Sequence, residues 1–335
     1  MDGFPLELRY KPTPLVAVAG APKDFIVAVE KATSAVTIET QRSCPIFRFL
    51  STSPKELIIP PRNDKDKPLD YIPEGILPAG WITALSHKIP CAILYVVEWD
   101  AHDFKAREYE HFAALDSIRA SAKVRNMPVL VMLLKKDAFA ANDERLVPFK
   151  RKCQLDNRFF LNFVKDEFSV SMIQLEGALK RCALEFYVEE SKLVKKKKEK
   201  LNKTAHLKLI VRASYKMAFY SELCNDFASA VKHYSAAYTQ LRDVKKNWKD
   251  YDEIKVVAEI LNFRLCYLHL ERNTLSNATT QFHQHVNYYR SLIGDPDREF
   301  QHYAWVSRQF QIFGELLQLF SFMAPTPAAG QVTSG

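Results

Sequence analysis

The first residues that invite a search for chemistry follow a short apolar run near the amino terminus. Leu15–Ala19 predicts a strand, and the turn after it contains Gly20 and then Lys23 and Asp24. A phosphate-binding loop needs several glycines, whose backbone N–H groups surround the phosphate, and a Lys-Ser/Thr pair. This turn has one glycine, and the carboxylate of Asp24 would repel phosphate. The pattern therefore argues against nucleotide binding, and a nucleotide-binding α/β enzyme without standard motifs is kept only as an alternative.

Two further patterns resemble catalytic or metal-binding motifs only faintly. Leu134-Lys135-Lys136-Asp137 has the spacing of a guanine-reading Asn-Lys-x-Asp motif, but Leu134 replaces the Asn, and we interpret it as a charged loop after a strand. His283 and His285 are two residues apart, so on a helix they point about 200° apart and cannot share a metal. The sequence contains no Gly-x-Ser-x-Gly and no His-Glu-x-x-His. We therefore expect no catalytic residue, no cofactor and no metal.

The cysteines give the same indication. They are far apart and form no Cys-x-x-Cys pair, which predicts small buried hydrophobic residues rather than disulfides or a zinc site. They are Cys44, Cys91, Cys153, Cys182, Cys224 and Cys266.

The positive charge is concentrated in one segment. Between Lys180 and Lys216 there are twelve Lys/Arg and four Asp/Glu, a local charge of +8 that equals the net charge of the chain. Three interpretations stay open: a solvated helix end that needs no function, a contact with an anionic membrane or a partner, and a nucleic-acid contact, which no adjoining aromatic platform supports. The candidate contact residues are Lys192, Lys195, Lys196, Lys197, Lys198, Lys200 and Lys203.

The elements that would position these residues fall into two groups. Strands are predicted at 15–19, 44–50, 90–99, 128–134 and 158–164, with helices at 22–40 and 104–124 and a loop at 51–70. The runs at 90–99 and 128–134 are almost continuously apolar, as in strands covered on both faces of a parallel sheet. Alternation of strand and helix predicts a parallel-sheet α/β domain.

From residue 168 only helices are predicted. Their ranges are 168–200, 205–223, 227–246, 252–272, 276–293 and 298–323. Ala230, Tyr234 and Ala237 have the small-aromatic-small spacing of second helices in tetratricopeptide repeats, and Ala278, Phe282 and His285 repeat it 48 residues later, with His in the last place. We therefore predict tetratricopeptide-like α-solenoid helical pairs.

The domain organisation follows from these elements. We predict an α/β domain over 1–167, an α-helical repeat-like domain over 168–323 and a flexible tail over 324–335, and we expect further repeats to follow. The chain has 335 residues, of which 47% are hydrophobic and 12% aromatic, which suits packed cores. No stretch approaches the roughly 20 apolar residues of a membrane helix, and the amino terminus has no secretory pattern. We expect a soluble cytoplasmic chain.

Several motifs in order resemble one known family. The longest is Leu201-Asn202-Lys203-Thr204-Ala205-His206, with Val211-Arg212 and Lys216-Met217-Ala218-Phe219-Tyr220-Ser221-Glu222-Leu223 after it. Upstream are Phe4-Pro5-Leu6-Glu7-Leu8, Tyr71-Ile72-Pro73-Glu74-Gly75-Ile76-Leu77 and Gly80-Trp81; downstream are Ala304-Trp305-Val306-Ser307-Arg308-Gln309-Phe310-Gln311 and Phe313-Gly314-Glu315-Leu316. Together they resemble the foie gras domain of trafficking protein particle (TRAPP) complex subunit eleven, from about residue 4 to 320.

The resemblance implies a function and a setting. It implies a non-catalytic scaffold or adaptor in a complex that activates Rab-type GTPases, in ER-to-Golgi transport and autophagy. The implied partners are other TRAPP subunits and, indirectly, a Rab, at Golgi or ER–Golgi intermediate membranes, with no nucleic acid. Members of the family are much longer than this chain. We interpret the motif residues as mainly structural, namely Tyr71, Pro73, Gly75, Gly80, Trp81, Phe219, Ala230, Tyr234, Trp305 and Phe310.

Overall fold

The computed structural model describes most of the chain in separate ranges. These are 11–35, 46–62, 68, 73–78, 80–99, 104–136, 146–244 and 251–323. Several features singled out in the sequence therefore lie outside the described residues: the motif at 4–8, Cys44, Tyr71, Asp137 and the segment 324–335.

The amino-terminal part is built on one five-stranded parallel sheet with the order β2-β1-β3-β4-β5. In register, Val16 of β1 pairs with Ala92 of β3, and Ile93 pairs with Val129 of β4. The central strands are buried along almost their whole length, as their continuous apolar sequences require. The strands are β1 (Leu15–Ala19), β2 (Arg48–Thr52), β3 (Ala92–Glu98), β4 (Val129–Lys135) and β5 (Phe160–Val164).

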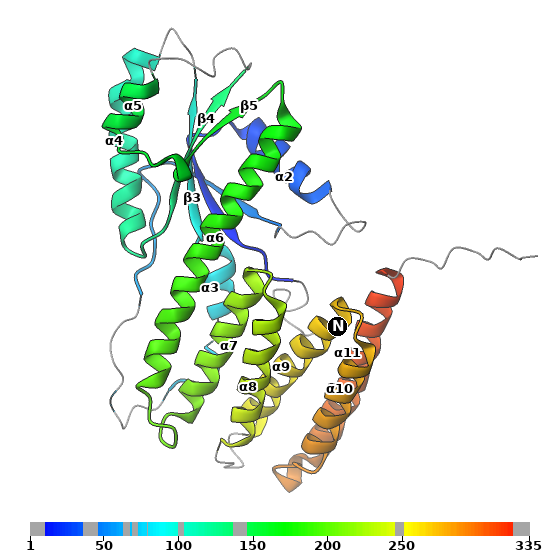
Figure 1. The fold of residues 1–335 in the computed structure, drawn as a ribbon. Coiled ribbons are helices and arrows are strands. Elements are labelled where there is room, and N and C mark those ends of the chain that lie inside the picture. The colour runs from blue at the N-terminus through cyan, green and yellow to red at the C-terminus, as the bar shows by residue number, and fades with distance from the viewer. Residues whose placement is uncertain are drawn as a thin grey trace, which may run out of the picture.

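Helices cover both faces of this sheet (Figure 1). On one side lie α4 (Phe104–Lys123) and α5 (Leu146–Lys152), and on the other lie α2 (Lys23–Ala35) and the start of α6. The ring of Phe25 on α2 meets that of Phe163 on β5 edge to face, with centroids 4.9 Å apart. The predicted parallel α/β fold is confirmed.

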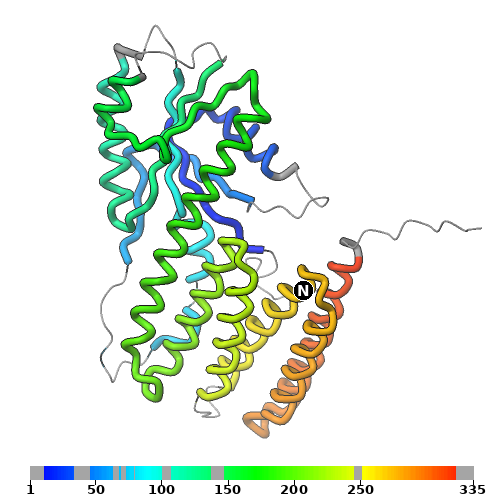
Figure 2. The backbone as a smooth tube through the Cα atoms, viewed as in Figure 1, coloured from blue at the N-terminus to red at the C-terminus, as the bar shows by residue number. Residues whose placement is uncertain are grey.

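One long helix joins the sheet to the rest of the molecule. Helix α6 (Phe168–Glu199) contacts β5 and β3 and also pairs with α7. Figure 2 shows it running from the sheet to the far end of the helical part. A single hydrophobic core contains Leu94 of the sheet, Leu179 of α6 and Leu261 of α9. The sheet and the helices are therefore continuous in packing, while a boundary at residue 167 stays a prediction.

The carboxy-terminal part is helical, as predicted. Each helix packs against the next, and α9 also contacts α11. Asn225 and Asn273 have positive φ values of 59° and 54° in the turns after α7 and α9, where the sequence predicts breaks. The helices are α7 (Leu207–Leu223), α8 (Phe227–Arg242), α9 (Tyr251–Glu271), α10 (Leu275–Arg290) and α11 (Glu299–Met323).

Some predicted boundaries are wrong. Strand β2 begins at Arg48 and includes Ser51 and Thr52, which we assigned to a loop, because pairing with β1 rather than hydrophobicity sets the bounds of this exposed edge strand. Residues Asn157–Phe159 form a short 3-10 helix before β5. Helices α8 and α10 end earlier than predicted, at Arg242 and Arg290. The short helices α3 (Trp81–His87) and α5 were not predicted at all.

Candidate interaction site

The predicted basic segment occupies the end of α6 and the turn into α7. Helix α6 ends at Glu199, so the lysines lie near its carboxy terminus, where the helix dipole favours positive charge. Lys197 and Lys198 are half-buried, while Lys192, Lys195, Lys196, Lys200 and Lys203 are exposed.

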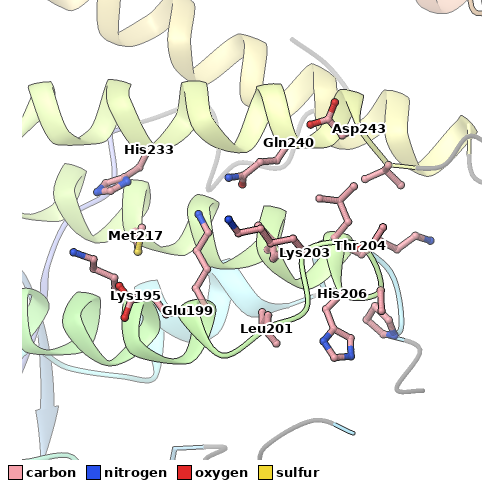
Figure 3. Close-up of a pocket in the computed structure, with 17 residues that line it drawn as sticks. Lys195, Glu199, Leu201, Lys203, Thr204, His206, Met217, His233, Gln240 and Asp243 are labelled. Atoms are coloured by element: carbon pink, nitrogen blue, oxygen red, sulfur yellow. The ribbon is translucent and has the colours of Figure 1, made fainter. Parts of the chain in front are cut away.

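The structure divides these lysines into two sets. Lys195, Lys198 and Lys203 line a cavity of about 930 Å³ that is bounded by the end of α6, the 201–206 turn, α7 and α8. Lys192 and Lys196 lie on the same helix but do not line this cavity. Figure 3 shows His233 and Gln240 of α8 on one side of the cavity, facing Lys195 and Glu199 of α6.

Polar groups on the cavity wall form a short network. Lys198 Nζ donates a hydrogen bond to Ser214 Oγ at 2.5 Å, and Ser214 Oγ donates to Gln240 Oε1 at 2.7 Å. Burial lowers the pKa of Lys198. Burial also lowers the pKa of His233, and the positive charges of Lys198 and Lys232 lower it further. Both shifts are those of groups withdrawn from water, and Lys198 places positive charge near His233.

The cavity wall also contains Pro73, which we predicted as a structural motif residue, and Lys208 and His233, which sequence analysis did not single out as site residues. These three residues come from separate parts of the chain and meet only in the fold. No local pattern marks their convergence, because none of these segments has a motif of known binding chemistry.

The segment around Gly75 is fastened to α7 and α9. Arg212 Nε donates to Ile76 O at 2.9 Å and its Nη2 donates to Gly75 O at 2.8 Å. From α9, a carboxylate oxygen of Glu253 accepts the backbone N–H of Ile76. These contacts hold a turn against the helices.

Gly80 and Trp81 begin the next element. Gly80 caps the start of α3 with a φ of 70°. The ring of Trp81 packs against Tyr215 and Phe219 of α7, with centroid distances of 5.6 and 6.1 Å. Because the half-buried ring of Trp81 packs against these two rings, it fixes the position of α3 on α7.

The small-aromatic-small residues of α8 lie in the packed centre of the helices. Ala230, Tyr234 and Ala237 have no exposed surface. Tyr234 Oη donates to Glu222 Oε2 at 2.9 Å, and Glu222 in turn pairs with Arg264 of α9. Both side chains of this ion pair are buried, so removal of either one would leave the opposite charge buried without its partner.

The corresponding residues of α10 are buried as well. His285 is fully buried, and its Nδ1 lies 2.9 Å from Tyr238 Oη. Burial lowers the pKa of His285 to about 3, so the imidazole is neutral. His285 is therefore a packing residue, and the described part of the chain contains no group of three His, Cys, Asp or Glu side chains that could hold a metal.

The downstream motif residues lie on α11. Trp305 Nε1 donates to Glu259 Oε2 at 2.9 Å, which joins α11 to α9. Phe310 is 52% exposed, although its ring meets that of Phe282 at a centroid distance of 5.2 Å. Phe300 and Tyr303 are exposed on the same helix, at 71% and 49%.

The chain's candidate catalytic patterns have structural explanations. Gly20 has a φ of +79°, and a Cβ there would lie 2.5 Å from Val96 O, so this glycine permits close contact with β3. Leu134 and Lys135 belong to β4 and are buried, which corrects their assignment to a charged loop. The cysteines that the structure describes are free thiols, and all but the half-buried Cys224 are buried.

The described residues form a parallel α/β sheet that is joined through α6 to packed helices, and this arrangement defines the class of fold. None of the described helices has the length and apolar character needed to cross a membrane. Residues 250–334 match the family model described as "Foie gras liver health family 1".

Three curated relatives show similarity over most of the chain. It is 32% identical over 324 residues to "Trafficking protein particle complex subunit 11" from Bos taurus and to that from Homo sapiens, covering 93% of this chain and 28% of each relative. It is 34% identical over 255 residues to the Gallus gallus protein, covering 73% of this chain and 22% of the relative. The resemblance to the foie gras domain of TRAPP complex subunit eleven is thus confirmed, and the chain spans under a third of the length of these relatives.

Proposed function

We propose that this chain is a non-catalytic scaffold or adaptor part of a TRAPP-type tethering and Rab-activating complex. The observation that carries the proposal is the similarity to proteins named as subunit 11 of that complex, which extends over 93% of the chain. The contacts of the recognisable motif residues support a structural role for most of them, because they hold the turn at Gly75, helix α3 and the paired helices together. Phe310, by contrast, is exposed.

Helix α11 supplies the candidate surface for contact with other subunits. Phe300 and Tyr303 are three residues apart and Phe310 is seven further on, so the three side chains share one face of the helix. Exposed aromatic side chains in a group are typical of protein interfaces, where they contribute much of the binding energy. We propose that this face docks on another subunit of the complex.

The test is co-purification with the small TRAPP subunits after co-expression. We expect wild-type chain to recover them, and Phe300→Ser with Tyr303→Ser to reduce recovery by about tenfold or more, as for loss of an interface anchor. Tyr109→Ser is the matched control, because Tyr109 is 82% exposed on α4 and lies away from α11. Absence of every TRAPP subunit from a correctly folded wild-type preparation would refute the adaptor role.

The wider setting is part of the same proposal. We propose action in ER-to-Golgi transport and autophagy at Golgi or ER–Golgi intermediate membranes, with a Rab-type GTPase served only indirectly. The exposed lysines at the end of α6 support a second role in peripheral membrane binding, since each lysine near an anionic surface contributes about 1 kcal/mol. The two roles are compatible, because α11 and the end of α6 are separate surfaces.

A further inference from the structure

We propose that the cavity at the end of α6 binds a phosphorylated polyanion of the size of an inositol polyphosphate, either free or as the headgroup of a lipid. This site is independent of the proposed docking through α11. The proposal is also more specific than a general attraction of the basic segment to membranes, because it assigns binding to the lysines that line one cavity.

The charge arrangement is the first support. Lys195, Lys198 and Lys203 line the cavity, and within the described residues none of the three forms an ion pair with a carboxylate. The cavity is also lined by Lys208, which pairs with Glu253 at 3.4 Å, and by the acidic residues Glu199 and Asp243. Glu253 compensates Lys208, so the three other lysines and the two carboxylates leave an excess of one positive charge on the wall. Three lysines without an ion-pair partner among the described residues, facing one space, favour an anion that can contact several of them at once.

The buried polar groups are the second support. Lys198 is partly withdrawn from solvent, and its ammonium group donates a hydrogen bond to the neutral hydroxyl of Ser214. His233 also lies on the wall and is held toward its neutral form by burial and by Lys198. A phosphate would supply negative charge to Lys198 and accept a hydrogen bond from the imidazole, so binding would compensate groups that the protein itself leaves uncompensated.

The size and the walls of the cavity select the kind of anion. A volume of about 930 Å³ is much larger than a single phosphate needs and lies within the range of small-molecule sites. Leu201, Ile210 and Met217 form apolar parts of the wall. A compact ring with several phosphates fits both features, because its ring faces can lie against apolar side chains while its phosphates reach the lysines.

The test measures binding of the full chain to inositol hexakisphosphate by calorimetry. In parallel, sedimentation is measured with vesicles that contain phosphatidylinositol 4,5-bisphosphate and with vesicles in which phosphatidylserine supplies the same total charge. Lys195→Gln with Lys203→Gln removes two charges from the cavity. Lys192→Gln with Lys196→Gln is the matched control, because it removes two charges from the same basic helix outside the cavity.

We expect the cavity variant to bind inositol hexakisphosphate about tenfold more weakly than wild type or worse, and the control variant to change affinity by less than about threefold. Binding of both the soluble ligand and the phosphoinositide vesicles identifies a headgroup site, and binding of the soluble ligand alone identifies a site for the free polyphosphate. Equal losses in the two variants would overturn the proposal. So would a failure to bind inositol hexakisphosphate, whether the vesicles bind without distinguishing phosphoinositide from phosphatidylserine or do not bind at all.

Discussion

At the scale of single residues, Gly75 occupies a backbone conformation that other residues adopt at a cost. Its φ is +68°, and a Cβ at this position would lie 2.7 Å from Oε1 of Glu253. That oxygen accepts the N–H of Ile76, so it cannot move away without breaking the contact. We expect Gly75→Ala to lower the free energy of unfolding by about 2 kcal/mol, measured by urea denaturation.

The control substitution is expected to change the free energy of unfolding in the opposite direction. Gly314 lies within α11, where a Cβ would meet nothing within 4 Å. Gly314→Ala should raise the free energy of unfolding by up to about 1 kcal/mol, because alanine restricts the unfolded chain and favours helix. Equal effects of the two substitutions would contradict the structural role assigned to the turn at Gly75.

His285 makes stability depend on pH in a defined direction. Its pKa in the folded protein is about 3, below the usual value of 6.5, because the imidazole is buried. The unfolded chain therefore binds more protons at this residue between those two pH values, and stability falls as the pH drops from about 6.5 toward 3. We expect this residue to remove roughly 2 kcal/mol of unfolding free energy between pH 7 and pH 5.

The measurement compares wild type with His285→Asn by urea denaturation at several pH values. Asparagine keeps a polar group near Tyr238 but does not titrate. The variant should lose less stability than wild type over the same interval. Parallel pH profiles for the two proteins would show that His285 is not held neutral by the fold.

At the scale of elements, α6 is fastened to the α/β part by an ion cluster. Glu190 of α6 pairs with Arg62 at 2.6 Å and with Arg125 at 3.4 Å, and it accepts a hydrogen bond from Tyr220 of α7. Arg125 also donates to the carbonyl oxygen of Pro60. One carboxylate thus joins the segment before residue 63, the turn after α4, and helices α6 and α7.

We expect Glu190→Gln to cost about 3 kcal/mol of unfolding free energy, because it removes a negative charge that pairs with two largely buried guanidinium groups. Amide hydrogen exchange in residues 57–62 should become faster, since that segment loses its attachment. Glu189→Gln is the matched control, as Glu189 is exposed and, among the residues that the structure describes, pairs only with the exposed Lys192. Its effect should be within about 0.5 kcal/mol, and a similar loss in both variants would count against the cluster.

Sequence patterns predicted the long elements because hydrophobicity alone determines them. The buried strands β3 and β4 and the helices from α6 onward appear as continuous or periodic apolar runs. Helix α3 has only seven residues, too short for a clear period, and β2 is an exposed edge strand whose pairing with β1 sets its bounds. Local hydrophobicity carries little information about such elements.

The candidate sites were harder to predict because they combine distant residues. The lysines at 192–203 are visible as a charged run, but only the fold separates those that line the cavity from those that do not. Glu190 and Arg62 are 128 positions apart, and nothing local in either segment indicates the other. The sequence indicates a turn at Gly75 and an aromatic side chain at Trp81. It does not indicate which residues of α7 they contact.

At the scale of the whole molecule, the parts form one continuous structure with separate outward surfaces. The core extends from the sheet through α6 into the helices, so the sheet and the helical pairs are packed together. Exposed aromatics on α11 and lysines at the end of α6 remain available at the surface. This arrangement suits a rigid adaptor that presents different contacts in fixed positions.

The most direct measurement adds the purified chain to a TRAPP complex prepared without its subunit 11 and follows size-exclusion chromatography. The adaptor role predicts that the chain co-elutes with the complex in a fixed ratio, and that the region of the human relative matching this chain competes with it. The variant with Phe300→Ser and Tyr303→Ser should elute separately. A folded chain that never shifts into the complex, at concentrations where the human region does, would contradict the proposed role.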